Sequence, residues 1–209
     1  MSGVVIIGAG PGIGQAVARR FAREGLPVAL VARSQETLRS AVPGALTATA
    51  DAGDEKALTA ALDTIAAEHG VPDAVVYNAA VIRPDRPADL TLDDHLGRWA
   101  VNVGGAIVTA ARLLPAMAGR GRGSFLVTGG MPEPKAAYLS LSLGKAGIRT
   151  LVTALHEEYG PAGVHAASIT VGGVVAPGTA FDPDDIAEHY WRLHLQPRAA
   201  WEHEVRIGC

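Results

Sequence analysis

The stretch Val4-Val5-Ile6-Ile7-Gly8-Ala9-Gly10-Pro11-Gly12-Ile13-Gly14 places a glycine-rich turn directly after a short apolar run. A helical pattern begins inside the turn, so the glycines lie between a strand and a helix. Glycines at such a place allow a tight turn and let backbone N–H groups approach a diphosphate. The spacing is GxxxGxG and not GxGxxG, because Ile13 stands at the third glycine position. Glycine-rich turns also end ordinary strands, but this position in the chain predicts a dinucleotide-binding loop.

Short apolar runs alternate with longer amphipathic runs along the rest of the chain, which is typical of repeated βαβ units. We expect strands at about residues 3–7, 27–32, 45–50, 73–78, 123–128 and 163–171, with a short last strand near 203–207. We expect helices at about residues 12–24, 34–41, 54–68, 91–117, 138–159 and 184–195. Right-handed crossovers then predict an α/β fold, a doubly wound parallel sheet of the Rossmann type in a three-layer α/β/α sandwich.

Residues at the ends of the expected helices match the preferences of helix termini. Gly25 and Gly70 stand where a helix C-terminus needs a left-handed residue. Ser34 and Thr91 are the expected N-caps.

The composition excludes several classes of protein. The 209 residues, 48% of them apolar, suit one domain over residues 1–209, with a short lid-like segment at about 173–195. The net charge of −3 does not indicate a surface that binds nucleic acid or an anionic membrane. Apolar runs are broken by Gly, Pro or charge before membrane-spanning length, and no secretory signal is visible, so we expect a cytoplasmic protein. The one cysteine, Cys209, excludes an intramolecular disulfide, and the seven histidines match no zinc spacing, so we expect no metal.

The end of the second expected strand bears on which dinucleotide would bind. An acidic residue there would accept hydrogen bonds from a ribose 2′-hydroxyl and favour NAD(H). Ala32 cannot do so, whereas Arg33 can pair with a 2′-phosphate. We therefore expect NADP(H) in preference to NAD(H), the alternative being a solvated arginine at a strand end.

Further motifs follow the strands in order. Asp51 comes after the third strand, and Tyr77-Asn78-Ala79-Ala80 ends the fourth. Asn102 lies in Val101-Asn102-Val103-Gly104, and Gly172 lies in Ile169-Thr170-Val171-Gly172-Gly173. Together with the glycine loop, these motifs resemble the short-chain dehydrogenase/reductase family over nearly the whole chain. Ala80 stands where the family's Asn-Ala-Gly motif has glycine, and Val171 stands where the family has proline.

The resemblance implies roles for these residues. The diphosphate would lie on the loop of Gly8, Gly10, Gly12, Ile13 and Gly14. Asp51 would meet the adenine ring, Asn78 and Ala79 would line the cofactor site, and Gly172 would contact the nicotinamide carboxamide. Asn102 falls where the family has a catalytic-site asparagine.

The family's chemistry needs a Tyr-x-x-x-Lys pair and a serine after the fifth strand. The spacing puts tyrosine and lysine on one helix face, one turn apart. Lys145, followed by Ala146-Gly147, matches the lysine and would hold the nicotinamide ribose. Leu141 stands at the tyrosine position and Gly130 at the serine position. Both residues that handle the proton are therefore missing.

Four side chains are candidates to replace them. Tyr138 lies two turns before Lys145 if the helix already runs there, roughly 10 Å along the axis. Thr128 shares the side of Gly130 but lies deeper in the sheet, and Ser140 and Ser142 point elsewhere on the helix. Packing or capping is the favoured interpretation for all four. Tyr138 is the best of them and is kept, with Asn102 and Lys145, as a candidate catalytic residue.

Three functions remain open. The first is an NADP(H)-dependent oxidoreductase that acts on a carbonyl or alcohol with an altered proton donor, since loss of a general acid costs about 10²–10⁴-fold in rate and not all of it. The second is a non-redox enzyme such as an isomerase, cyclase or dehydratase, and the third is an NADP(H)-binding protein without turnover. The first is preferred because the family is overwhelmingly redox. The substrate, a small molecule, is not named by the sequence.

Two groups of residues remain outside this scheme. Arg83, Asp85 and Arg86 follow the fourth strand and would suit an acidic substrate, although a solvated loop is the simpler interpretation. Tyr190, Trp191 and Trp201 are expected in a pocket or at a subunit contact.

The resemblance also implies assembly. Family members pair through the helices expected here at about 91–117 and 138–159, and Ala106, Ala110 and Ala111 would allow close contact. We therefore expect a homodimer or homotetramer.

Overall fold

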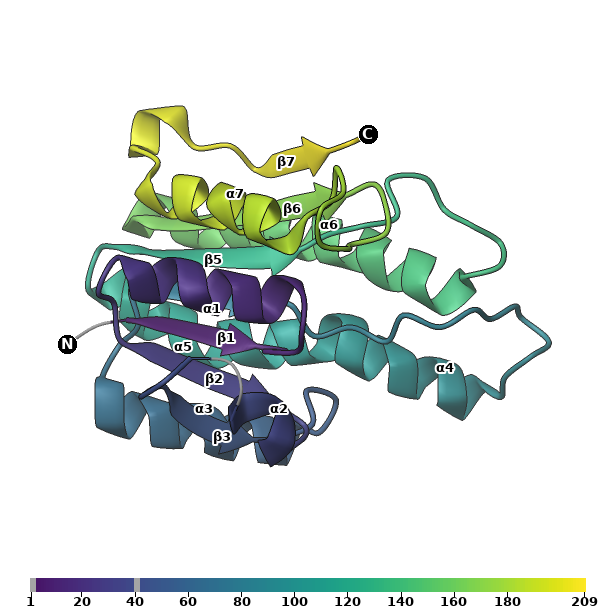
Figure 1. Ribbon diagram of the computed structural model, residues 1–209, viewed down its shortest axis with the longest axis horizontal. Coiled ribbons are helices and arrows are strands. Elements are labelled where there is room, and N and C mark those ends of the chain that lie inside the picture. Colours follow the sequence, from purple (N-terminus) through teal and green to yellow (C-terminus); the bar gives the residue numbers. More distant parts are fainter. Residues whose placement is uncertain (1–2, 40–41) are drawn as a thin grey trace.

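The computed structural model describes residues 3–39 and 42–209, and its strands form one sheet (Figure 1). The strand order is β3-β2-β1-β4-β5-β6-β7, and every neighbouring pair is parallel. The strands are β1 (Val4–Ile7), β2 (Val28–Ala32), β3 (Leu46–Thr49), β4 (Ala74–Tyr77), β5 (Gly123–Thr128), β6 (Val164–Val171) and β7 (Glu204–Ile207). The order reverses between β1 and β4, where doubly wound sheets bind their ligands. The predicted fold class is confirmed.

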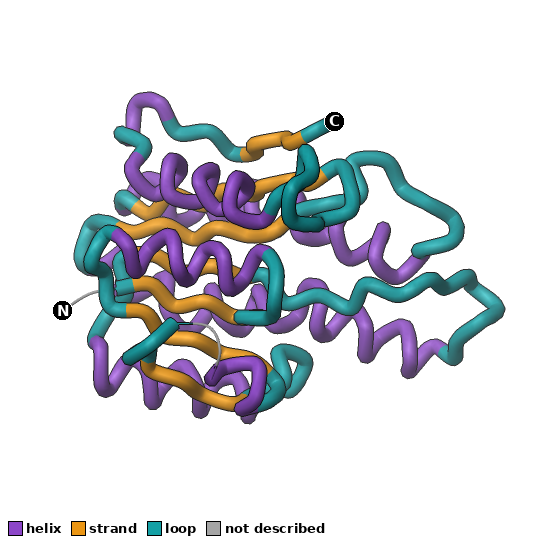
Figure 2. The backbone as a smooth tube through the Cα atoms, viewed as in Figure 1, coloured by secondary structure: helices purple, strands orange, loops and turns teal. Residues whose placement is uncertain are grey.

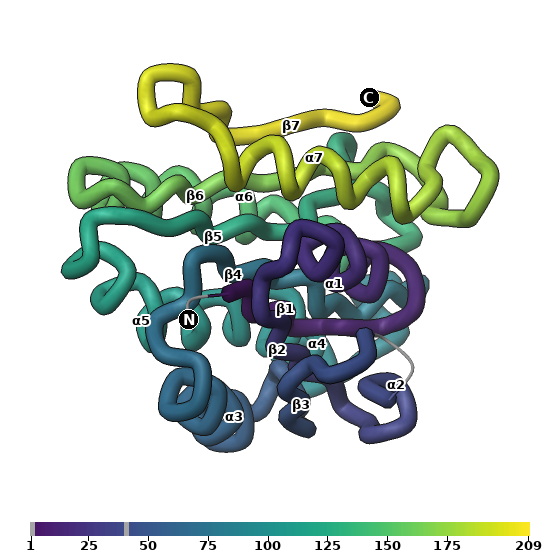
Figure 3. The backbone as a smooth tube through the Cα atoms, turned by 60° about the vertical axis from the view of Figure 1, so that its left-hand side comes forward, coloured from purple at the N-terminus to yellow at the C-terminus, as the bar shows by residue number. Residues whose placement is uncertain are grey.

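Helices cover both faces of the sheet, because successive residues of a buried parallel strand point to opposite sides and both must be covered. Val4 and Ile6 pack with α1 (Ile13–Arg23) and α7 (Pro183–Leu195), whereas Val5 and Ile7 belong to the core on the other face. The remaining helices are α2 (Gln35–Arg39), α3 (Glu55–His69), α4 (Leu92–Trp99), α5 (Gly105–Gly119) and α6 (Leu139–Tyr159). In Figure 2 the strands lie between α1 and α7 in front and α5 and α6 behind, and α1 and α7 lie side by side in Figure 3.

The helix ends follow local chemistry. Thr91 Oγ1 accepts from the backbone N–H of Asp94, whose carboxylate accepts from that of Thr91, which closes a capping box. Ser34 Oγ accepts from the Thr37 N–H at 3.3 Å. Gly25 and Gly70 have φ of 79° and 78°. All four predicted helix ends are confirmed, while the last two residues of the helix expected at 34–41 lie outside the described residues.

The helix expected at 91–117 is not continuous. A π-helical turn, Ala100–Gly104, separates α4 from α5. The Tyr77 hydroxyl donates to the Val101 carbonyl at 2.5 Å, and such an inserted side chain is a known cause of local widening. Burial, and to a lesser degree the charge of Asp51, raise the pKa of Tyr77, so its hydroxyl remains a donor.

Residues Leu92–Gly119 are long and apolar enough, by length and composition alone, to cross a membrane, with a mean hydropathy of 1.4. We expected every apolar run to be broken before membrane-spanning length, and this expectation is wrong for Leu92–Gly119. Half of that window is buried inside the fold, and Ala106, Leu113 and Met117 belong to the core on the sheet. Packing on the sheet accounts for its apolar character.

Candidate functional site

Two adjoining cavities lie at the C-terminal ends of the strands, where the loops after β4 and β5 project beyond the sheet (Figure 1). The larger, about 600 Å³, runs from the glycine loop to the ends of β2 and β3. The smaller, about 320 Å³, runs from the glycine loop to the end of β5 and the start of α6. Pro11, Asn78 and Ala80 line both, so the two cavities form one elongated site.

The glycine loop joins the two cavities. A Cβ at Gly8 would overlap the backbone of Ala79, and one at Gly14 would overlap the Gly8 carbonyl, so both positions pack too closely for a side chain. Gly12 is the N-cap of α1 with φ of 101°, which favours glycine, and the space beside it is open. Gly10 also faces open space. The loop therefore presents bare backbone at a helix N-terminus, which suits an anionic diphosphate.

The far end of the larger cavity collects polar side chains. Arg33 and Asp51 both line it and are exposed. Ser34 and Thr37 line it as well, and their hydroxyls lie 2.8 Å apart. Sequence reasoning treated Ser34 only as a helix cap and did not consider Thr37. A guanidinium beside two hydroxyls is an arrangement that suits a phosphate.

Asn78 connects the two cavities through hydrogen bonds. Its Nδ2 donates to the Gly8 carbonyl at 2.8 Å, and its Oδ1 accepts from Thr128 Oγ1 at 2.7 Å. Because Thr128 has one hydroxyl proton, which it gives to Asn78, the Tyr190 hydroxyl donates to Thr128 at 2.6 Å. Burial raises the pKa of Tyr190. The sequence did not predict that Thr128 and Tyr190 form a hydrogen-bonded chain with Asn78. Tyr190 is fully buried, beneath Thr128 of the smaller cavity.

Lys145 lies at the base of the smaller cavity. Its side chain is buried, and its Nζ donates to the Thr128 carbonyl at 2.6 Å. Leu141, one helical turn earlier, lines the same cavity, and a Cβ at Gly130 would lie 3.7 Å from Lys145 Cε. Both residues that replace the family's proton donors therefore adjoin Lys145. Burial, with a smaller effect of Arg149, lowers the pKa of Lys145 to about 8.

Tyr138 and Gly172 are candidate residues that line neither cavity. Tyr138 is the N-cap of α6, with φ of −141°, so the helix does not yet run there and the proposed two-turn spacing to Lys145 fails. Gly172 packs against Gly208 and Cys209 beside β7, and the cavity is instead lined by its neighbours Val171 and Gly173.

Asn102 lies behind the site in the π-helical turn. Its side chain is buried, its Oδ1 accepts from the Val81 N–H at 2.7 Å, and Gly144 of α6 packs against it. Val81 lines the larger cavity. Asn102 therefore holds the loop after β4 against α6 and does not itself line either cavity.

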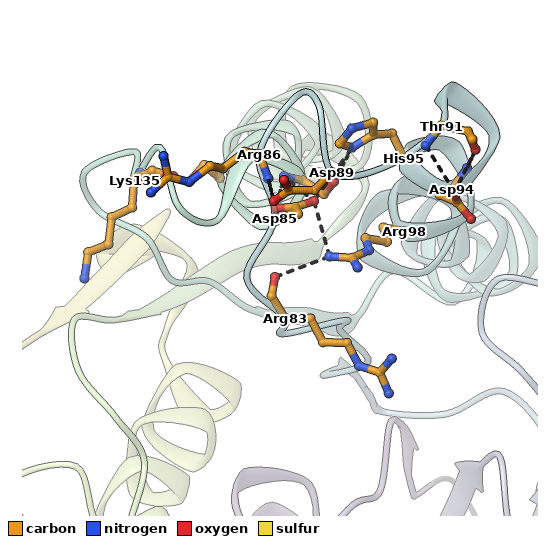
Figure 4. Close-up of polar contacts among 11 residues, drawn as sticks. Arg83, Asp85, Arg86, Asp89, Thr91, Asp94, His95, Arg98 and Lys135 are labelled. Atoms are coloured by element: carbon orange, nitrogen blue, oxygen red, sulfur yellow. Dashed lines mark hydrogen bonds and ion pairs between the residues drawn. The ribbon is translucent and has the colours of Figure 1, made fainter.

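The loop after β4 is anchored by Asp85, which is 2% exposed. Asp85 accepts from the Ser140 N–H at 3.1 Å and pairs with Arg98 at 3.2 Å, while His95 Nδ1 lies 2.7 Å from Ser140 Oγ (Figure 4). Burial alone would raise the pKa of Asp85, but the bonds from Ser140 and the charge of Arg98 outweigh it and lower the pKa. The expectation of a solvated loop is thus wrong for Asp85. The side chains of Arg83 and Arg86 point away from it (Figure 4).

Comparison with known proteins agrees with this geometry. A family model described as short chain dehydrogenase matches residues 2–186. The chain is 32% identical over 188 residues to glucose 1-dehydrogenase of Gluconobacter oxydans. The aligned region covers 83% of this chain and 70% of that protein. It is 31% identical over 200 residues to the probable oxidoreductase EphD of Mycobacterium bovis, covering 84% of this chain but 33% of that protein.

Among solved structures, a metagenomic short-chain oxidoreductase in complex with NADP superimposes with a TM-score of 0.88 at 27% identity, covering 100% of this chain and 98% of that one. The family model spans most of the chain, and the superposition extends over all of it. The chain therefore belongs to the short-chain dehydrogenase family of oxidoreductases.

Proposed function

We propose that the protein is an NADP(H)-dependent oxidoreductase of small carbonyl or alcohol compounds in which the family's usual proton relay is absent. The observation that carries the proposal is the larger cavity, with its bare glycine loop and with Arg33, Ser34 and Thr37 grouped at its far end. A 2′-phosphate would meet Arg33 there, and Asp51 lines the same cavity for the adenine ring. A related structure that contains NADP supports the same preference.

The smaller cavity is placed for the reacting end of the cofactor. Bound nicotinamide supplies or accepts a hydride in such a site. Lys145 would hold the ribose, and Ile13, Leu141 and Val171 would keep water from the reacting atoms. The volume of about 320 Å³ and the largely apolar walls suit a compact substrate with few polar groups.

The direct experiment follows NADPH consumption over a panel of small ketones and aldehydes, beside product analysis with no cofactor added. Oxidation of NADPH coupled to alcohol formation is expected. Turnover that needs no cofactor would instead indicate a non-redox enzyme.

A second candidate function is NADP(H) binding without turnover. Leu141 and Gly130, next to Lys145, favour it, because neither side chain carries a transferable proton. Tight NADPH binding with no turnover of any panel member, with or without cofactor, would select it.

We also propose a homodimer or homotetramer. Leu92, Leu96 and Trp99 are 71%, 53% and 44% exposed, and their spacing puts them on one face of α4. Ala106 and Ala110 cannot be part of the contact as expected, because both are buried against the chain's own sheet. Light scattering at micromolar concentration should find no monomer, and Trp99→Glu should dissociate the assembly.

A further inference from the structure

Lys145 is the one ionisable side chain that lines the smaller cavity over residues 3–39 and 42–209. Two other polar side chains, Asn78 and Thr128, line it, and the rest is backbone or apolar. A reaction that moves a proton in this cavity must therefore use one of these three groups or water.

The other hydroxyls are already committed or lie elsewhere. Thr128 gives its proton to Asn78 Oδ1 and accepts from Tyr190, so it has no proton left for a substrate. Ser140 is bonded to His95, and Ser142 Oγ accepts from the Lys135 N–H at 3.0 Å. Tyr138 does not line the cavity.

The position of Lys145 leaves its end open to a ligand. An ammonium has three N–H groups, and the Thr128 carbonyl accepts one of them. Gly130 leaves the space beside Lys145 Cε unfilled, and the leucine one turn earlier offers no competing polar group. The side of Lys145 that serine and tyrosine would cover can therefore receive the oxygen of a substrate.

We propose that Lys145 itself is the general acid for carbonyl reduction and the general base for alcohol oxidation. The inference rests on the proposed redox function. In reduction, a hydride adds with its electron pair to the carbonyl carbon, and the π electrons of the C=O bond move to the oxygen. The oxygen takes a proton from Nζ, and the neutral amine recovers a proton from water. Alcohol oxidation is the reverse, and the nicotinamide is the redox partner in both directions.

The surroundings of Lys145 allow both protonation states near neutral pH. Burial and the charge of Arg149, one turn further along α6, lower the pKa of Lys145 to about 8. The other elements around it contribute uncharged groups: the Thr128 carbonyl at the end of β5, Gly130 in the loop after it, Val171 from β6 and Ile13 from α1. Reduction needs the protonated lysine and should be lost as pH rises through about 8, whereas oxidation should be gained over the same range.

The first test needs neither cofactor nor substrate. The chain has three lysines, and Lys56 and Lys135 are exposed. After reductive methylation with ¹³C-formaldehyde, carbon NMR should show the Lys145 signal titrating near pH 8, below the usual lysine value of about 10.4. Titration of Lys145 above pH 10 would overturn the proposal.

The second test separates proton transfer from charge. In the holoenzyme, Lys145→Arg should bind NADPH within about threefold of the wild type but lose about 10²-fold or more in ketone reduction. Lys145→Ala should regain turnover when small primary amines are added, with a rate that depends on the pKa of the amine. Lys56→Arg is the matched control and should behave as the wild type.

The outcomes distinguish this inference from the proposed function. Turnover by Lys145→Arg at the wild-type rate, or a rescue rate that is independent of amine pKa, would overturn the role of Lys145 while NADPH oxidation persists. Wild-type protein that binds NADPH and oxidises none of it over the ketone and aldehyde panel would overturn the proposed function, and the inference with it.

Discussion

The larger and the smaller cavity adjoin each other along the ends of the strands, yet they keep the family pattern to different degrees. Around the larger cavity, the glycine loop, Asp51 and Asn78 are all present. Around the smaller cavity, Lys145 remains but Leu141 and Gly130 replace the proton donors. The glycine loop rests on backbone packing that admits no side chain at Gly8 and Gly14, whereas the reacting end depends on a few functional groups that can change without disturbing the fold.

The largest effect is expected from restoring the missing groups. Gly130→Ser with Leu141→Tyr should place two hydroxyls beside Lys145, because a Cβ at Gly130 meets nothing closer than 3.7 Å and Leu141 already lines the cavity. The φ of 158° at Gly130 strains the backbone of a serine there, so the double variant should also unfold more easily than the wild type. Lys145 would favour the ionised tyrosine and lower its pKa. Steady-state reduction of small ketones with NADPH should rise about 10²-fold, the lower end of what a general acid supplies.

The matched control is Gly130→Ser with Leu141→Phe, which adds the ring without its hydroxyl. An equal gain in this control would mean that cavity shape and not the proton relay limits the reaction. If Tyr138→Phe abolished wild-type turnover, Tyr138 would be the donor despite its place outside the cavity.

A smaller effect is expected from crowding the glycine loop. Gly14→Ala should lower the free energy of unfolding by about 1–3 kcal/mol and weaken NADPH binding, because the added Cβ overlaps the Gly8 carbonyl. Gly10→Ala, whose Cβ meets nothing within 4 Å, should leave the unfolding free energy within about 0.5 kcal/mol. Chemical denaturation measures both, and equal losses would show that the loop is less tightly packed than described.

Cofactor preference comes next. Arg33→Asp should reverse the order of affinity, so that NADH binds more tightly than NADPH. A charge-assisted pair with phosphate contributes about 1.5–3 kcal/mol, which is about tenfold or more in affinity. Fluorescence titration of both cofactors measures it, and equal affinities in the wild type would contradict the role given to Arg33.

The smallest effect is expected from Asp85, which anchors the loop after β4. The pKa of Asp85 is lowered in the folded protein, so its carboxylate stabilises the fold above the unfolded pKa of about 3.9, and this contribution is lost as pH falls through the lower folded pKa. Asp85→Asn should therefore cost about 1 kcal/mol at pH 7, with the difference from wild type shrinking below pH 4. Urea unfolding at several pH values measures it, and a difference that does not change with pH would show that packing alone is responsible.

The strands and the glycine loop could be predicted because they depend on local signals. Apolar runs such as Val4–Ile7 and Val164–Val171 specify buried parallel strands, and Gly8 and Gly12 mark the turn. The π-helical turn at Ala100–Gly104 could not be predicted, because it depends on a hydroxyl that reaches from Tyr77 on β4. No pattern in the neighbouring residues indicates that contact.

In the candidate site, too, some features could be predicted from the sequence and others depend on the tertiary structure. The sequence by itself determined the fold and the glycine loop, which follow from the order of apolar and amphipathic runs, and the resemblance to the family assigned Gly130, Leu141 and Lys145 their positions. Only the tertiary structure decided that the proton of Thr128 is taken by Asn78, that Tyr138 lies outside the cavity and that Asp85 is buried. Each of those facts depends on groups far apart in the chain, whose distances are set by how the helices pack on the sheet.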